Sequence, residues 1–211
     1  MAFVVFEGLD ASGKSTLISL VEESLKKSDK DTVFLRDPGS TDLGERLRNI
    51  ILATDIEPPV AKAETLMYQT ARVQMVEKNI KPQLAKGSWV LCDRFYSSTV
   101  AFQAFGRGLD LEEVEGLNQF VAGDCPPDMF ILLDITVEES TRRKENRAKE
   151  SGVGQDRLEK EDRSFQEKVR EGYLYQAKKN PERWLVLDGT KTPEELFELT
   201  IQEFKRHGWL Q

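Results

Sequence analysis

The chain has 211 residues, of which 39% are apolar and 32% charged, and its formal net charge is −7. This length suits a single domain over residues 1–211 that needs no disulfide or metal to build its core. The acidic surplus argues against non-specific nucleic-acid binding, and no apolar run approaches the ~20 residues that a membrane span needs. The N-terminus lacks the basic stretch and cleavage site of a signal peptide, so we expect a cytoplasmic protein with no membrane or nucleic-acid partner.

Short apolar runs alternate with longer helical patterns along the chain. The runs cover residues 3–7, 32–35, 89–92, 129–133 and 184–187. Continuous apolar strands separated by helices are typical of a parallel sheet that is covered on both faces. In such sheets ligands bind beyond the carboxyl ends of the strands, where Glu7, Asp93, Asp134 and Asp188 fall. The pattern therefore predicts an α/β fold with a parallel sheet of about five strands between layers of helices.

Two stretches between the strands have distinctive patterns. Residues 60–86 form a long helical pattern that we expect to bend near Pro82. Residues 141–163 are dense in charges of both signs and contain a Ser-Gly-Val-Gly sequence. This second stretch is either a solvated helix pair with a loop or a mobile lid, and composition alone favours the helix pair.

The segment from Gly8 to Ser15 matches the phosphate-loop pattern G-x-x-x-x-G-K-[ST] at every fixed position. A predicted strand precedes it and a predicted helix follows, so backbone N–H groups and the helix N-terminus would face a bound phosphate. Lys14 would bridge the outer phosphates, and the Ser15 hydroxyl would ligate Mg²⁺. The alternative is a glycine-rich turn without function. The predicted ATP-binding residues are Gly8, Leu9, Asp10, Ala11, Ser12, Gly13, Lys14, Ser15 and Thr16.

The loop alone does not separate a kinase from a GTPase switch or an ATP-driven motor. A GTPase should carry an Asn-Lys-x-Asp motif, which the chain lacks. A kinase for a small phosphorylated acceptor needs a second anion site built from arginine. Arg36, Arg72 and Arg94 are candidates for such a site.

Several motifs, in this order, are similar to those of the thymidylate kinase family. They are Phe6 to Asp10 leading into the loop, Arg36-Asp37-Pro38-Gly39-Ser40-Thr41, Leu66 to Arg72, Ile80-Lys81-Pro82, Asp93-Arg94-Phe95, Gly106-Arg107-Gly108 and Asp156-Arg157. The resemblance covers nearly the whole chain and implies a P-loop NTPase fold with a mobile lid. It also implies a kinase that transfers the γ-phosphoryl group of ATP reversibly to dTMP, with Mg²⁺, in a homodimer.

The resemblance implies a role for each residue of a dTMP site. Asp10 would accept a hydrogen bond from the sugar 3′-hydroxyl, and Arg36 and Arg94 would clamp the acceptor phosphate. The Tyr68 ring would pack on thymine, and Arg72 would donate to a thymine carbonyl. The remaining predicted dTMP contacts are Ser98, Phe102 and Gln103, with Phe102 crowding a ribose 2′-hydroxyl.

The catalytic residues that the resemblance implies come from three places. Lys14 belongs to the loop, and Asp93 and Arg94 follow the third strand, with Asp93 holding Mg²⁺ through water. Asp134 has the same sequence setting as Asp93, so spacing does not decide between them. A lid over about residues 142–158 would supply arginine, and its candidates are Arg143, Arg147 and Arg157.

The sequence departs from the family pattern at Asp37 and Ser40, where Glu and Gly are commoner, and at Ala11, where some members have a basic residue. Two other functions stay open at this point. One is a kinase for another nucleotide or deoxynucleoside, and the other is a non-catalytic nucleotide-binding switch. The apolar stripe of residues 60–86 would form the homodimer face, unless it packs only against its own sheet.

Overall fold

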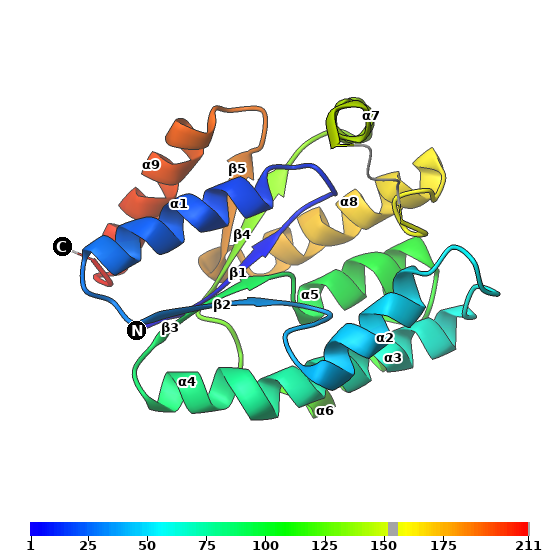
Figure 1. Ribbon diagram of the computed structural model, residues 1–211, viewed down its shortest axis with the longest axis horizontal. Helices are drawn as coiled ribbons and strands as arrows, with labels where there is room; N and C mark the ends of the chain where they lie inside the picture. The colour runs from blue at the N-terminus through cyan, green and yellow to red at the C-terminus, as the bar shows by residue number, and fades with distance from the viewer. Residues whose placement is uncertain (152–155, 211) are drawn as a thin grey trace.

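The computed structural model describes residues 1–151 and 156–210. Its strands are β1 (Phe3–Glu7), β2 (Thr32–Arg36), β3 (Trp89–Asp93), β4 (Met129–Asp134) and β5 (Trp184–Asp188). They form one sheet in the order β2-β3-β1-β4-β5, and every neighbouring pair is parallel (Figure 1). The α/β fold with a five-stranded parallel sheet is therefore confirmed.

Helices connect the strands and cover the sheet. The α-helices are α1 (Lys14–Lys27), α2 (Asp42–Leu52), α3 (Ala61–Met75), α4 (Lys81–Ala85), α5 (Tyr96–Thr99), α6 (Leu111–Ala122), α7 (Val137–Ser151), α8 (Arg163–Lys179) and α9 (Pro193–Arg206). Two π-helical segments, η1 (Val76–Ile80) and η2 (Val100–Gly106), and one 3₁₀ turn, η3 (Pro181–Arg183), complete the helical elements of the described residues. None of these helices has the length and apolar character to cross a membrane.

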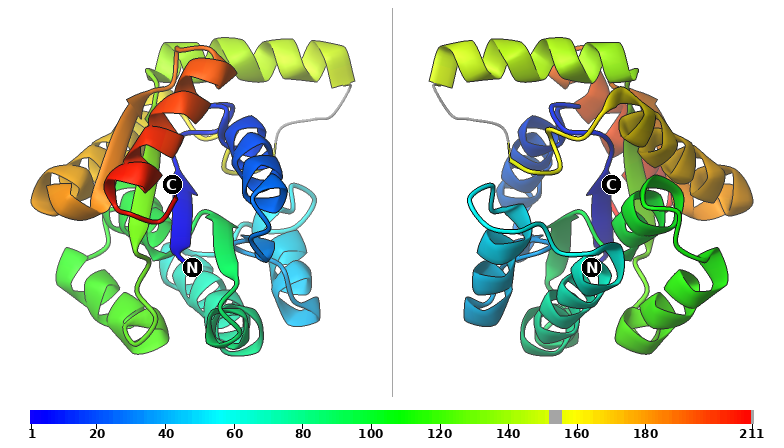
Figure 2. Two further views of the ribbon diagram at one scale, coloured as in Figure 1. Left: turned by 90° about the vertical axis from the view of Figure 1, so that its left-hand side faces the viewer. Right: turned by 90° about the vertical axis from the view of Figure 1, so that its right-hand side faces the viewer.

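The sheet is buried on both faces, which explains why its strands are almost continuously apolar. Alternate residues of β1 enter different cores: Val4 and Phe6 pack with α1 and α9, whereas Phe3 and Val5 pack with the α3–η1 and α6 side. Figure 2 shows α1 and α9 on one side of the sheet and α4 and α6 on the other. The period of two along a strand produces this division.

Strand register brings the functional ends of three strands together. Asp93 at the end of β3 lies beside Phe6 of β1 on one side and Arg36 of β2 on the other. Gly8 follows β1 with a φ of +137°, and a Cβ added there would lie 2.5 Å from the carbonyl oxygen of Leu133. The loop after β1 can therefore approach β4 only with glycine at this position.

Two predicted helical stretches differ in detail from the structure. The stretch over residues 60–86 is helical from Ala61 to Ala85, but its turn at 76–80 is π-helical, and Pro82 follows this turn inside the continuous helical segment. The charged stretch contains α7, a turn-rich segment after Asp156 and the start of α8. The predicted lid of residues 142–158 lies partly outside the described residues, since it includes 152–155.

Candidate active site

The phosphate loop joins β1 to α1 and lies at the carboxyl edge of the sheet. Lys14 folds back over it, and its Nζ donates to the carbonyl oxygens of Gly8 and Leu9 at 3.1 Å each. The side chain is 7% exposed, and burial together with nearby Arg94 lowers the pKa of Lys14. A cleft, here called the phosphate cleft, opens beside the loop. Its lining residues are Asp10, Ala11, Ser12, Gly13, Lys14, Ser15, Thr16, Arg36, Asp37, Arg48, Asp93, Arg94, Arg147, Asp156 and Glu159.

Two of these lining residues fit a magnesium ion. Ser15 presents its side chain at the exposed start of α1, and Asp93 lies at the end of β3. The Oδ1 atom of Asp93 is buried and accepts no hydrogen bond from the described residues. A buried carboxylate oxygen without a donor is costly unless a cation or water faces it. Asp134, which spacing could not distinguish from Asp93, is instead bound by Arg170 at 2.6 and 2.8 Å.

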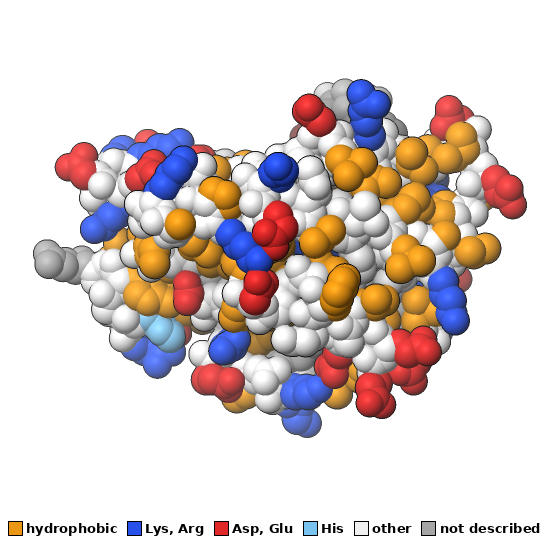
Figure 3. Space-filling view, turned by 90° about the horizontal axis from the view of Figure 1, so that it is seen from below, with side chains coloured by type: hydrophobic (Ala, Val, Ile, Leu, Met, Phe, Trp, Pro, Cys, Tyr) orange, Lys and Arg blue, Asp and Glu red, His pale blue; other side chains and the backbone are white. Residues whose placement is uncertain are grey.

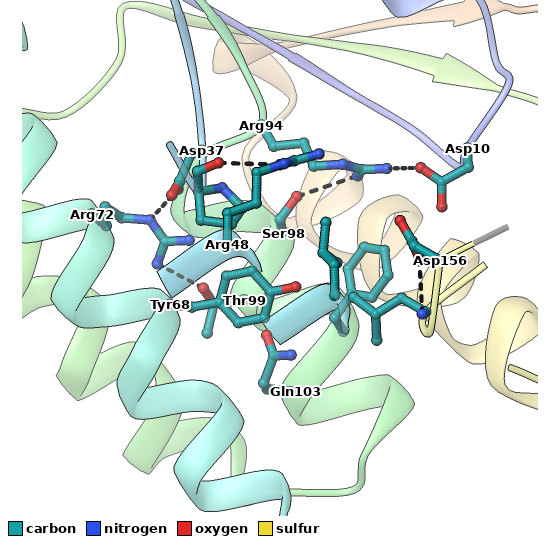
Figure 4. Close-up of a pocket in the computed structure, with 14 residues that line it drawn as sticks. Asp10, Asp37, Arg48, Tyr68, Arg72, Arg94, Ser98, Thr99, Gln103 and Asp156 are labelled. Atoms are coloured by element: carbon teal, nitrogen blue, oxygen red, sulfur yellow. Dashed lines mark hydrogen bonds and ion pairs between the residues drawn. The ribbon is translucent and has the colours of Figure 1, made fainter. Parts of the chain in front are cut away.

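A second cleft, here called the acceptor cleft, lies between η2, α3 and the phosphate loop (Figure 4). It is lined by seven of the eight residues predicted to bind dTMP, namely Asp10, Tyr68, Arg72, Arg94, Ser98, Phe102 and Gln103. The eighth, Arg36, lines the phosphate cleft and pairs with Glu45 at 3.1 Å. The other lining residues are Asp37, Pro38, Arg48, Leu52, Thr99, Asp156 and Leu158.

Arg48 and Arg94 line both clefts. Arg48 Nη1 donates to the carbonyl oxygen of Pro38 at 3.1 Å, and in Figure 4 its guanidinium group lies at the same end of the acceptor cleft as that of Arg94. Burial lowers the pKa of Arg48, and the positive charges of Arg36 and Arg94 lower it further. Asp10, Asp37 and Asp156 also line both clefts, so the boundary carries both signs of charge. The guanidinium groups of Arg48 and Arg94 supply the donors there that can bind an anion.

Sequence reasoning missed Arg48. The structure shows the reason for its direction: Arg48 lies four residues after Gly44 and three before Ile51, both of which are buried. Residues at these spacings share one face of a helix, so Arg48 had to point inward from α2.

Arg94 is held in a network of buried polar groups. Its backbone adopts a φ of +70°, and its two Nη atoms donate to Asp10 Oδ1 and to the Tyr173 hydroxyl at 2.7 Å each. Burial opposes ionisation of Asp10, but the charges of Arg94 and Lys14 outweigh it and lower the Asp10 pKa. Arg94 therefore reaches the boundary of the clefts with its guanidinium already oriented.

Glu7 and Tyr173 complete this network, and neither was predicted as a site residue. Glu7 at the end of β1 is fully buried and accepts hydrogen bonds from Ser97 Oγ at 2.5 Å and Ser98 Oγ at 2.8 Å. Ser98 Oγ also lies 2.8 Å from the Tyr173 hydroxyl, so Tyr173 of α8 connects the serine to Arg94. Burial raises the pKa of Glu7, although Arg94 acts in the opposite direction.

The three predicted lid arginines point in different directions. Arg143 donates to the carbonyl oxygens of Ser12 at 3.3 Å and Gly189 at 2.9 Å, so it braces the back of the phosphate loop. Arg147 lines the phosphate cleft and bonds Glu159 at 2.5 Å. Arg157 donates to the carbonyl oxygen of Ile51 at 2.9 Å and pairs with Glu64, away from the loop.

The fold and the two clefts define a phosphate-loop kinase whose acceptor carries a phosphate of its own. The family model of thymidylate kinase matches residues 6–199. The chain is 44% identical to the thymidylate kinase of Bdellovibrio bacteriovorus over 96% of its own length and 94% of that protein. It is 39% identical to the thymidylate kinase of Kosmotoga olearia, with the same coverage.

A solved structure supports the same relationship. The crystal structure of thymidylate kinase from Ehrlichia chaffeensis has a TM-score of 0.76 and 29% identity, and the match covers 97% of this chain and 98% of that one. The chain belongs to the thymidylate kinase family. Its activity is that of a nucleoside monophosphate kinase acting on dTMP, an ATP-dependent phosphoryl transfer. Neither a kinase for another nucleotide or deoxynucleoside nor a non-catalytic nucleotide-binding switch is favoured.

Proposed function

We propose that the phosphate cleft binds ATP, that the acceptor cleft binds dTMP, and that Arg48 and Arg94 hold the dTMP phosphate where the clefts meet. The observation that carries this proposal is that both arginines line both clefts. A phosphate between them would face the γ-phosphate of ATP on the loop. Arginine binds phosphate oxygens through a planar fork, which fixes the direction of attack as well as the charge.

The reaction needs alignment more than acid–base chemistry. An oxygen of the dTMP phosphate is already a nucleophile, so it can attack the γ-phosphorus without a strong general base. Lys14 and Arg94 would neutralise the charge that develops during transfer. Arg147 would be the lid arginine that assists them, because it lines the phosphate cleft. Ser15, and Asp93 through water, would hold Mg²⁺, which supplies further charge neutralisation when bound.

The nucleoside of dTMP would fill the rest of the acceptor cleft. Tyr68 is 9% exposed and Phe102 is 6% exposed, so both offer apolar ring surface inside the cleft. Asp10 lies near the sugar end, and Arg72, Ser98 and Gln103 supply polar groups for the base and the sugar. Burial raises the pKa of Tyr68, so its phenol stays neutral beside the ligand.

We propose that the protein works as a homodimer in the cytoplasm, where its nucleotide substrates are found. The support for a dimer is exposed apolar surface. Leu66 on α3 is 56% exposed and Phe120 on α6 is 86% exposed. Figure 3 views the molecule from below, the side on which α4 and α6 lie in Figure 1, and apolar side chains are exposed on it. A dimer would cover this apolar surface. Sedimentation of Phe120→Glu beside the wild type tests this proposal: the variant should be a monomer.

The phosphate clamp can be tested with a matched pair of arginines on α2. Arg48→Met should bind dTMP roughly 10- to 100-fold more weakly, because it loses charge-assisted hydrogen bonds, while thymidine binding should change little. Arg46→Met is the control, since Arg46 is exposed on the same helix. Calorimetric titration measures both ligands. Equal weakening of dTMP and thymidine in Arg48→Met would contradict the clamp.

A further inference from the structure

Glu64 is a fully buried carboxylate at the start of α3, behind the acceptor cleft. Four N–H groups surround it. Gln103 Nε2 donates at 3.0 Å, Arg107 donates from Nε at 3.1 Å and from Nη2 at 3.3 Å, and Arg157 Nη2 donates as well. Burial opposes ionisation of Glu64, but the hydrogen bonds from Arg107 and Arg157 outweigh it and lower its pKa. Glu64 is therefore an ionised group that only accepts hydrogen bonds.

Because Glu64 only accepts hydrogen bonds, it determines the orientation of the Gln103 amide. Gln103 is 1% exposed and lines the acceptor cleft from η2. A carboxylate without a proton cannot donate, so the amide NH₂ of Gln103 must face Glu64 and the carbonyl Oε1 must face the opposite way. Figure 4 shows the oxygen of Gln103 directed toward Tyr68, across the acceptor cleft.

We infer that Glu64 is a positioning residue for base selection, because it holds the Gln103 amide with only its carbonyl oxygen presented to the base. This inference rests on the proposed placement of the dTMP base against Gln103. Thymine carries an N–H donor at N3, which a fixed carbonyl oxygen can accept. Cytosine has an unprotonated acceptor at N3, so the same oxygen would face a lone pair and reject it.

The two arginines that bind Glu64 stabilise this orientation of the Gln103 amide. Arg107 is held in turn by Glu161 at 2.6 Å and lies over the Phe165 ring at 4.6 Å. Arg157 is anchored to Ile51 through the carbonyl oxygen of that residue at 2.9 Å. Two guanidinium groups keep the Glu64 carboxylate charged, so the Gln103 amide has no alternative orientation of similar energy.

The test compares discrimination between dTMP and dCMP, measured as the ratio of their kcat/KM values. Glu64→Gln offers a donor and an acceptor in place of two acceptors, so the Gln103 amide is free to turn over. The dTMP/dCMP ratio should fall roughly tenfold. Gln103→Met should also lower the ratio, because it removes the carbonyl oxygen. Glu161→Gln is the control: it weakens the outer pairing of Arg107 at 2.6 Å but leaves both arginines and Gln103 on the Glu64 carboxylate, so the ratio should stay near that of the wild type.

The outcomes separate this inference from the proposed function. A reduced ratio in Gln103→Met with an unchanged ratio in Glu64→Gln would overturn the role of Glu64 and leave the base site in place. An unchanged ratio in both variants would overturn the inference and the placement of the base against Gln103. An equal loss in Glu161→Gln and Glu64→Gln would show that loosened packing, and not amide orientation, sets the ratio.

The wild-type protein gives a readout that does not depend on a variant folding. One Nε2 proton of Gln103 is hydrogen-bonded to a buried carboxylate, so in an NMR experiment it should exchange slowly with solvent whether dTMP is present or absent. Protection that appears only with dTMP bound would mean that the amide NH₂ faces the ligand, which would overturn the inference.

Discussion

Arg72 lies against Asp37 in the wall of the acceptor cleft, with 2.5 Å between Nε and Oδ2, and both side chains are 1% exposed. Arg72 Nη1 also donates to Thr99 Oγ1 at 2.7 Å and to Gln69 Oε1 at 2.9 Å. The arginine is therefore fixed before any ligand enters. A pre-positioned guanidinium would lose little conformational entropy on binding the base that we propose it contacts.

Removal of Arg72 should affect both stability and the use of dTMP. Arg72→Ala leaves the Asp37 carboxylate buried without its partner, so the free energy of unfolding should fall by about 3–5 kcal/mol. The KM for dTMP should rise far more than the KM for ATP. Urea unfolding and steady-state kinetics measure the two effects. The double variant Asp37→Asn/Arg72→Ala should recover part of the stability, and equal increases in both KM values would remove Arg72 from the acceptor site.

Lys14 should be essential for turnover and not for folding. Lys14→Ala should lower kcat roughly 10²- to 10³-fold, because the transferring phosphoryl group loses a fixed positive charge. Lys27→Ala, at the exposed end of the same helix, is the control and should keep its activity. Turnover in the purified Lys14→Ala protein at the wild-type level would refute the assignment of the phosphate loop.

Tyr173 should act on the reaction through Arg94. Tyr173→Phe removes the hydroxyl that accepts from Arg94 Nη1 at 2.7 Å, so the guanidinium loses one of its two shortest anchors. We expect kcat/KM for dTMP to fall about tenfold, with little change in the KM for ATP. Tyr175→Phe is the control, because Tyr175 is 38% exposed on the same helix. If Tyr175→Phe has the same effect, the network around Arg94 is not its cause.

Asp93 should set the dependence of the reaction on Mg²⁺. Asp93→Asn removes the charge of a carboxylate whose buried Oδ1 accepts no hydrogen bond from the described residues. The Mg²⁺ concentration that gives half-maximal activity should rise roughly tenfold, since a neutral amide is a weaker partner for the hydrated ion. Asp134→Asn should leave this concentration unchanged, because Asp134 pairs with Arg170. If a metal titration instead shows that Asp134→Asn raises this concentration and Asp93→Asn does not, the roles of the two aspartates are exchanged.

The sequence was most informative where function depends on local pattern. The five apolar runs predicted the sheet, and the phosphate loop was recognised from spacing and from the strand and helix beside it. These features depend on residues that are close in the chain. The helical stretch expected over residues 60–86, with a bend near Pro82, is helical from 61 to 85, but the π-helical segment at 76–80 was not predicted.

Features that depend on packing between distant elements were not predictable. Asp93 and Asp134 each end an apolar strand, and they differ only in their neighbours, since Arg170 of α8 reaches Asp134. Arg48 and Tyr173 belong to helices whose inward faces are set by tertiary contacts. The roles of the lid arginines also depend on distant partners, as Arg157 shows through its pairing with Glu64.

The most direct test of the account is an ADP-release assay with Mg-ATP that offers dTMP, dUMP, dCMP, UMP, AMP and thymidine in parallel. The two clefts predict strong turnover with dTMP, weaker turnover with dUMP and little with the others, because the acceptor needs both its base and its phosphate. A preference for another monophosphate, or thymidine accepted as readily as dTMP, would contradict the acceptor site described around Arg48, Arg94 and Gln103.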